Sequence, residues 1–177
     1  MLDKKKHRLF FALWPDRAIA TKLHTLAQTL VTWDDERVIP ASLIHLTLRY
    51  VGNADPALQK CLEAMAQDIS INQFEFTLQT LGYWKKPRVI WVAPESSLES
   101  LNNLAMKIEQ GCQQCGIQAE ERIFAPHITL IRKARRTPIV NIQTPLKWCA
   151  TDFVLVESKS IDGGVVYEVL KRWPLLE

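Results

Sequence analysis

Two short segments of the chain carry the same arrangement of a histidine and a threonine. His45–Leu48 and His127–Leu130 both have the order His, apolar, Thr, apolar. The chain contains only four histidines, and neither His7 nor His24 begins such a pattern. A single histidine with apolar neighbours in a strand is more often structural than catalytic, but two matched copies favour a functional pair.

The chemistry of this pair depends on strand geometry. Because alternate side chains of a strand share a face, His45 lies on the same face as Thr47, and His127 on the same face as Thr129. Of two opposed imidazoles, one can take a proton from an entering water while the other donates one to a leaving oxygen. The threonine hydroxyls can hydrogen-bond the non-bridging oxygens of a phosphate. This set predicts opening of a strained 2′,3′-cyclic phosphate without a metal or a covalent intermediate.

The sequence supports a metal site or a nucleotide-cofactor site less well than it supports an acid-base pair of histidines. Zinc binding by His45 and His127 lacks a third ligand with recognisable spacing, and Cys112–Cys115 has the spacing of only half a zinc site. The six glycines form neither a dinucleotide-binding fingerprint nor a phosphate-binding loop. We therefore expect no cofactor.

Composition indicates a soluble protein of ordinary size. The 177 residues, 47% of them hydrophobic, predict a single domain over residues 1–177. The net charge of +3 is compatible with an anionic ligand but does not by itself indicate nucleic acid. No apolar run reaches the roughly 18 residues that span a bilayer or forms a signal-peptide core. We therefore expect a cytoplasmic protein whose four cysteines are reduced.

The hydrophobic periodicity predicts alternating strands and helices. Apolar stripes at helical spacing predict helices over Ile19–Leu30, Leu58–Ile69 and Leu98–Cys112. Alternating or β-rich runs predict strands at residues 8–14, 43–51, 74–84, 88–93, 125–131, 153–161 and 165–173. A polar connection is expected over residues 133–145, and Gly163 and Gly164 are expected to form the last hairpin turn. The pattern is typical of an α+β protein with a mainly antiparallel sheet and helices on its outer faces.

Beyond the two tetrads, several segments resemble one known family. They are the segments 8–13 (RLFFAL), 49–52 (RYVG), 88–91 (RVIW) and 170–173 (LKRW), together with Pro126 and Arg132 around the second tetrad. Together they resemble the two-histidine (2H) phosphoesterase superfamily, and within it the bacterial RNA 2′,3′-cyclic phosphodiesterases once called 2′-5′ RNA ligases. The likeness spans nearly the whole chain.

This resemblance implies more than the residues alone show. It implies a bilobal fold with two mainly antiparallel sheets related by a pseudo-twofold around a cleft, and an RNA end as substrate. It implies His45 as proton donor and His127 as proton acceptor, Arg132 as a phosphate contact besides Thr47 and Thr129, and Phe11 beside the nucleobase. The expected product is a 2′-phosphomonoester.

Two other functions stay open at this point. The tetrads could hold the phosphate of an RNA end without turning it over, or the substrate could be a small cyclic nucleotide. Measured turnover separates the first alternative from an enzyme. Reverse 2′-5′ ligation and the oligomeric state are not determined by the sequence.

Overall fold

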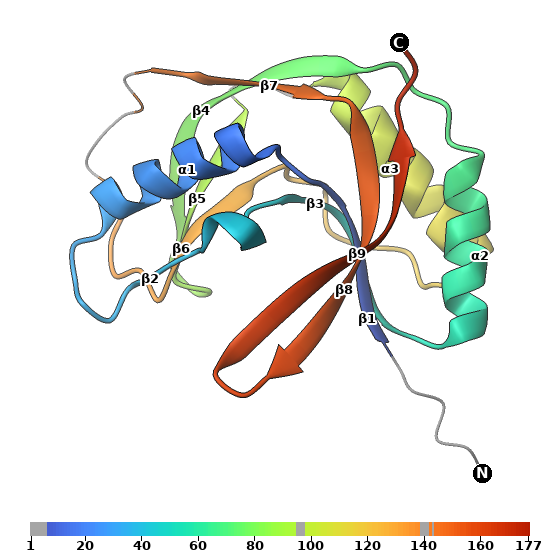
Figure 1. Cartoon of the computed structure of the whole chain (residues 1–177), viewed down its shortest axis with the longest axis horizontal. Coiled ribbons are helices and arrows are strands. Elements are labelled where there is room, and N and C mark those ends of the chain that lie inside the picture. The colour runs from blue at the N-terminus through green and yellow to red at the C-terminus, as the bar shows by residue number, and fades with distance from the viewer. Residues whose placement is uncertain (1–6, 95–97, 139–141, 143) are drawn as a thin grey trace.

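The computed structural model describes residues 7–94, 98–138, 142 and 144–177. In this part the chain folds into a mixed α/β structure with one curled, antiparallel sheet (Figure 1). The strands are β1 (His7–Leu13), β2 (Arg37–Val38), β3 (Leu46–Ala54), β4 (Phe74–Trp84), β5 (Val89–Pro94), β6 (Ile128–Arg132), β7 (Leu146–Ala150), β8 (Asp152–Ile161) and β9 (Gly164–Pro174). The helices are α1 (Arg17–Leu30), the 3₁₀ turn η1 (Ala41–Leu43), α2 (Pro56–Gln67) and α3 (Glu99–Gln114).

Side-chain caps fix where the first two long helices begin. The carboxylate of Asp16 accepts the Ile19 N–H at 2.8 Å, and that of Asp55 accepts the Leu58 N–H at 2.9 Å. Each bond satisfies one of the backbone donors that the first turn of a helix leaves free. Pro56, at the start of α2, lacks an N–H that would need a partner.

The sheet consists of two halves that meet at one residue pair. The strand order is β7-β4-β5-β6-β3-β1-β8-β9, with β2 added beside β6, and all of these pairs are antiparallel. β3 and β6 pair only at Leu46 and Ile128. The two sheets expected from the sequence are therefore two halves of one hydrogen-bonded sheet that narrows to a single bridge at its centre.

Two of the helices each cross from one half of the sheet to the other. α1 follows β1 but packs against β6 and β2, whereas α3 follows β5 but packs against β3. Figure 1 shows α1 on one side of the sheet's centre and α2 and α3 on the other. Each half is thus covered by a helix that the other half supplies, which holds the two halves together around the β3–β6 bridge.

Two short strands, β2 and β7, were not predicted from the sequence. β2 has two residues, too few for any periodicity to detect, and its Val38 pairs with Ile131. β7 begins just after the expected polar connection, part of which (139–141 and 143) lies outside the described residues. Its alternation is visible only in the structure, where Trp148 and Ala150 are buried while Cys149 between them is exposed.

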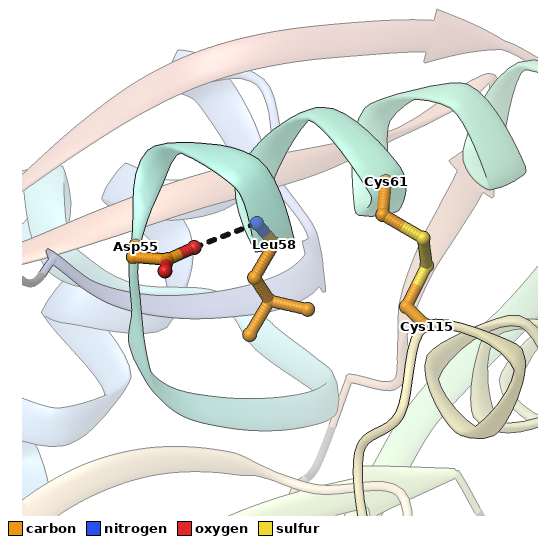
Figure 2. Close-up of a disulfide and its surroundings, with 4 residues drawn as sticks. All are labelled: Asp55, Leu58, Cys61 and Cys115. Atoms are coloured by element: carbon orange, nitrogen blue, oxygen red, sulfur yellow. Dashed lines mark hydrogen bonds between the residues drawn. A yellow bond between two sulfur atoms is a disulfide. The ribbon is translucent and has the colours of Figure 1, made fainter.

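The prediction that all four cysteines are reduced is wrong. Cys61 of α2 and Cys115 at the end of α3 form a disulfide with a Cα–Cα distance of 5.8 Å (Figure 2). Cys112 is a buried free thiol and Cys149 an exposed one. The two bonded residues are 54 positions apart, and only the packing of α2 beside α3 brings them together. Cys115 belongs to this bond, so the Cys112–Cys115 spacing is not half of a zinc site.

We expect the disulfide to contribute measurably to stability. Closing a loop of 54 residues removes chain entropy from the unfolded state, an effect of roughly 2–4 kcal/mol in measured proteins. Cys61→Ser should lower the free energy of urea unfolding by about that amount, as should dithiothreitol on the unmodified protein. Cys149→Ser, at an exposed free cysteine, is the control. Equal stability of Cys61→Ser and the oxidised protein would contradict this role.

Candidate active site

The two tetrads lie side by side in the centre of the sheet. His45 directly precedes β3 and His127 directly precedes β6, and the residues that follow them, Leu46 and Ile128, are the pair at which the two strands meet. An antiparallel pair has a local twofold axis perpendicular to the sheet, and an axis through this pair exchanges one tetrad with the other. The repetition noticed in the sequence is therefore a repetition in space.

This register brings all four motif side chains to one face. Leu46 and Ile128 are fully buried in the core, so their neighbours on either side point to the opposite face. His45 and His127 then stand in a diagonal relation across the two strands, for which residues are typically about 7–8 Å apart and their Cβ atoms somewhat closer. Thr47 and Thr129 occupy the other diagonal. A tetrahedral phosphate at the centre would face two imidazoles and two hydroxyls.

Both imidazoles are held by the same local hydrogen bond. Nδ1 of His45 lies 2.7 Å from the carbonyl oxygen of Leu43, and Nδ1 of His127 lies 2.8 Å from that of Ala125. A carbonyl oxygen can only accept, so Nδ1 carries the hydrogen in each ring. Nε2 is left as the nitrogen that exchanges a proton in both histidines. His24, by contrast, bonds the Ile39 carbonyl oxygen from α1 and belongs to no such pair.

Three aromatic rings surround His45. Its ring stacks on Trp14 with the ring centroids 5.4 Å apart, and it contacts Phe10 at 4.9 Å and Tyr167 at 5.2 Å. Phe10 belongs to β1 and Tyr167 to β9, so two strands and the residue that follows β1 build this aromatic enclosure. No local pattern in the sequence indicates that these residues belong to the site. Tyr167 is 122 positions away from His45 and carries no local signal.

The enclosure keeps His45 neutral in the unliganded protein. Burial lowers the pKa of His45 to about 4 from an ordinary value of 6.5, and the positive charge of Arg132 and the proximity of His127 add to the effect. Burial also lowers the pKa of His127, again with a contribution from Arg132. A bound phosphate would counter these effects, because a nearby negative charge favours the imidazolium form.

These pKa shifts predict that stability falls on acidification. Between pH 6.5 and about 4, the unfolded chain binds a proton at His45 that the folded protein does not. The free energy of unfolding therefore increases with pH across this window, and acidification through the window lowers it. The expected slope is roughly 1.4 kcal/mol per pH unit for a fully differing proton. His45→Phe should flatten the dependence measured by urea unfolding between pH 7 and pH 5. An unchanged slope in this variant would argue against a buried neutral His45.

The expected place of Phe11 beside a nucleobase is wrong. Phe11 is 0% exposed and packs in the core against Phe153 and Trp173. The alternation of β1 instead turns Phe10 towards His45, because neighbouring residues of a strand point to opposite faces. Phe11 is thus a core residue, and it is the adjacent phenylalanine, Phe10, that contacts His45.

Arg49, two residues after Thr47, is held by contacts to α3 and to the segment that follows α3. The register between β1 and β3 shifts at this point, since Phe11 pairs with Arg49 but the next residue, Ala12, pairs with Thr47. Such a bulge breaks the simple alternation. The Arg49 guanidinium is ion-paired with Glu109 of α3 and donates to the Gln118 carbonyl oxygen at 2.8 Å.

Arg132 lies near both histidines. It is the exposed last residue of β6, and its charge lowers the pKa of His45 and of His127. A cation that acts on both imidazoles is also placed to attract a phosphate between them.

A large groove extends from His127. It lies between α3, the 120–127 segment and the β4–β5 turn, it has a volume of about 1360 Å³, and its lining includes Thr47 and His127. The Trp84 ring contacts the His127 ring edge-on with centroids 4.4 Å apart. Trp84 could not be predicted from the sequence, because it ends β4 and comes near His127 only through the β4–β5–β6 pairing.

Two wider features of the described residues bear on function. No three side chains of His, Cys, Asp or Glu in this part of the chain converge in a way that could hold a metal ion. Within the same residues, no helix is long and apolar enough to cross a membrane.

Comparison with known proteins gives consistent matches. Residues 15–158 match the family model described as the 2′-5′ RNA ligase superfamily. An RNA 2′,3′-cyclic phosphodiesterase of Escherichia coli K12 is 31% identical over 173 residues, which cover 96% of this chain and 97% of that protein.

Solved structures agree with the sequence matches. The crystal structure of E. coli LigT complexed with 3′-AMP superposes with a TM-score of 0.91 at 28% identity, covering 98% of this chain and 100% of that one. The crystal structure of TT0787 of Thermus thermophilus gives a TM-score of 0.83 at 25% identity, covering 94% of this chain and 97% of that one.

Proposed function

The chain belongs to the 2′-5′ RNA ligase superfamily, and from this premise we propose that it is an RNA 2′,3′-cyclic phosphodiesterase that hydrolyses cyclic phosphate ends to 2′-phosphomonoesters. The observation that carries the proposal is the pairing of the two tetrads at Leu46 and Ile128, which presents two histidines and two threonines on one face. The similar E. coli protein bears the name of this activity.

In the proposed reaction the phosphate lies over the β3–β6 bridge. Nε2 of His127 takes a proton from water as the water oxygen attacks phosphorus. Nε2 of His45 donates a proton to the 3′ oxygen as its bond to phosphorus breaks, so that the phosphate stays on the 2′ oxygen. Thr47, Thr129 and Arg132 would stabilise the charge on the non-bridging oxygens. The division of roles between the histidines rests on the family resemblance.

The low pKa of His45 restricts how it can act as the donor. In the free protein His45 is neutral near pH 7, so the donor role requires that it gain a proton together with the anionic substrate. The aromatic rings around His45 leave it only partly exposed to water, and a lower local dielectric strengthens the attraction between an imidazolium and a phosphate. Substrate binding and protonation of His45 are therefore coupled in this proposal.

The direct test is incubation with an oligoribonucleotide that ends in a 2′,3′-cyclic phosphate, in the presence of excess chelator. We expect a 2′-phosphomonoester as the product. A 3′-phosphate would overturn the proposed choice of bond, and loss of activity on chelation that zinc or magnesium restores would overturn the metal-independent mechanism. Binding without turnover would favour the non-catalytic RNA-end module.

We also propose a cytoplasmic location and a single domain over residues 1–177 with two pseudo-symmetric lobes, and the two halves of the sheet joined at the β3–β6 pair support the second proposal. The disulfide between Cys61 and Cys115 removes the argument from reduced cysteines for the first of them. No protein partner is proposed.

A further inference from the structure

The segment that leads to His127 has no helix or strand of its own. Residues 117–127 connect the turn after α3 to β6, and His127 is the last of them. All side chains over residues 118–123 are exposed, so burial does not hold this stretch in place. The Ala125 carbonyl oxygen, which accepts the Nδ1 hydrogen of His127, belongs to the same segment. The direction of the His127 ring therefore depends on how residues 117–127 are fixed.

Arg49 of β3 fixes the middle of this segment. Its Nη2 donates to the Gln118 carbonyl oxygen at 2.8 Å, and its Nη1 lies 3.8 Å from a carboxylate oxygen of Glu120. Its Nε donates to Glu109 of α3, and Glu109 in turn accepts the Glu120 N–H at 3.0 Å. Arg49 and Glu109 thus hold the segment through two backbone groups, and hydrogen bonds to charged groups are stronger than those between neutral groups.

The helix that carries Glu109 is itself tied to the rest of the fold. The disulfide between Cys61 and Cys115 joins the end of α3 to α2 (Figure 2), and α3 packs against β3. Burial acts to raise the pKa of Glu109, but hydrogen bonds, first among them the one from Gln113, outweigh it and lower the pKa. The Glu109 carboxylate therefore stays charged, and it forms with Arg49 a fixed point for the segment.

The Arg49 guanidinium is used within the protein and not as a phosphate contact. Its side chain is 10% exposed, and its charge is paired with Glu109 and Glu120. The local twofold of the β3–β6 pair relates Arg49 to Ile131, since each lies three residues past the bridge, and Ile131 is fully buried. Arg49 is therefore not the counterpart of Arg132.

We propose that Arg49 is a positioning residue for His127, because it holds residues 117–127 so that Nε2 of His127 stays within reach of the attacking water. The inference rests on the proposed function, in which His127 takes a proton from that water. It also links the two tetrads, since the strand that follows His45 fixes the segment that precedes His127. A misplacement of about 1 Å can lower a rate by about 10²-fold, so this support matters to turnover although Arg49 does not touch the substrate.

The kinetic test uses Arg49→Met, which keeps a long side chain and removes the guanidinium. We expect kcat on a 2′,3′-cyclic phosphate end to fall by about tenfold to 100-fold, with KM changed by less than about threefold. Arg49→Lys keeps the charge but not the fork of donors, so it should recover part of the loss. Unchanged kcat with a raised KM in Arg49→Met would indicate a direct contact with substrate and overturn the inference.

The matched control is Lys159→Met. Like Arg49, Lys159 is a cation paired with two carboxylates, those of Glu157 and Glu168, but it lies in the β8–β9 hairpin, outside the network that holds residues 117–127. This variant should keep normal kcat. An equal loss of kcat in the control would mean that any broken ion pair has the same effect, and the inference would fail.

A double variant shows whether Arg49 acts through His127. Without the His127 ring there is nothing left to position, so Arg49→Met/His127→Ala should be as slow as His127→Ala alone. A further loss, of the size seen in the single Arg49 variant, would place the effect of Arg49 elsewhere and overturn the inference.

Nuclear magnetic resonance of the imidazole nitrogens reports on the two rings without turnover. In the unmodified protein we expect His45 and His127 to carry the hydrogen on Nδ1, as their bonds to the Leu43 and Ala125 carbonyl oxygens require. In Arg49→Met, His127 should show a mixture of the two tautomers and faster exchange of its Nδ1 hydrogen. His45 should keep its tautomer, which makes it the internal control, because a general loss of structure would change both rings.

This measurement separates the inference from the proposed function. If the unmodified protein opens no cyclic phosphate but Arg49→Met alters His127 alone, Arg49 positions the ring and the proposed function fails. If the cyclic phosphate is opened and Arg49→Met leaves kcat and the His127 resonances unchanged, the function stands and the inference fails. Where Arg49→Met does not fold, Glu109→Gln, which removes the charge paired with Arg49, is expected to give the same changes in kcat and in the His127 resonances.

Discussion

His45→Ala and His127→Ala are each expected to lower kcat by about 10²- to 10⁴-fold, because each removes a group that transfers a proton in the transition state. The measurement is the initial rate of 2′-phosphate formation from a cyclic phosphate end, with circular dichroism to verify the fold. His24→Gln is a matched control, since His24 is also hydrogen-bonded through Nδ1 to a backbone carbonyl but lies on α1, outside the tetrads.

The double variant is the sharper test of cooperation between the histidines. Residues that act in one step give strongly non-additive losses, so His45→Ala/His127→Ala should be scarcely slower than either single variant. Losses that add would indicate two independent contributions. Near-normal turnover in a folded single variant would remove that histidine from the mechanism.

Thr47→Val and Thr129→Val are expected to lower kcat/KM by roughly 10- to 150-fold, the equivalent of about 1.5–3 kcal/mol for one hydrogen bond to a charged phosphate oxygen. Valine keeps the branched shape of threonine and removes only the hydroxyl. Because the β3–β6 pair relates the two threonines by a local twofold, the two losses should agree within a few-fold.

The control for this pair is Thr77→Val, at a half-buried threonine of β4 that lies away from the tetrads and pairs with Lys147. It should retain normal kcat/KM. A loss confined to only one of Thr47 and Thr129 would mean that the phosphate is held asymmetrically and not over the bridge.

The resemblance was most reliable for the fold and least reliable for single side chains. It indicated the antiparallel sheet and the two related halves, and the family match and the solved structures agree with this fold. It misplaced Phe11, because adjacent residues of a strand can have similar hydrophobicity but opposite faces. It also said nothing of the ion pair between Arg49 of β3 and Glu109 of α3.

Local patterns of the sequence determined most of the strands and helices and the choice of the two tetrads. Periodicity depends only on near neighbours, so the strand over 74–84 was predicted with its observed bounds. The repeated order of His and Thr was visible because both copies are contiguous. What these residues can do chemically follows from their types alone.

Only the tertiary structure decided what depends on distant segments. The Leu46–Ile128 pair, the Cys61–Cys115 bond and the contact of Tyr167 with His45 all join residues more than 50 positions apart. Such contacts form where the sheet curls and the helices cross, and no neighbouring residue specifies them. The low pKa of His45 has the same origin, because burial is a property of the packed chain and not of the histidine.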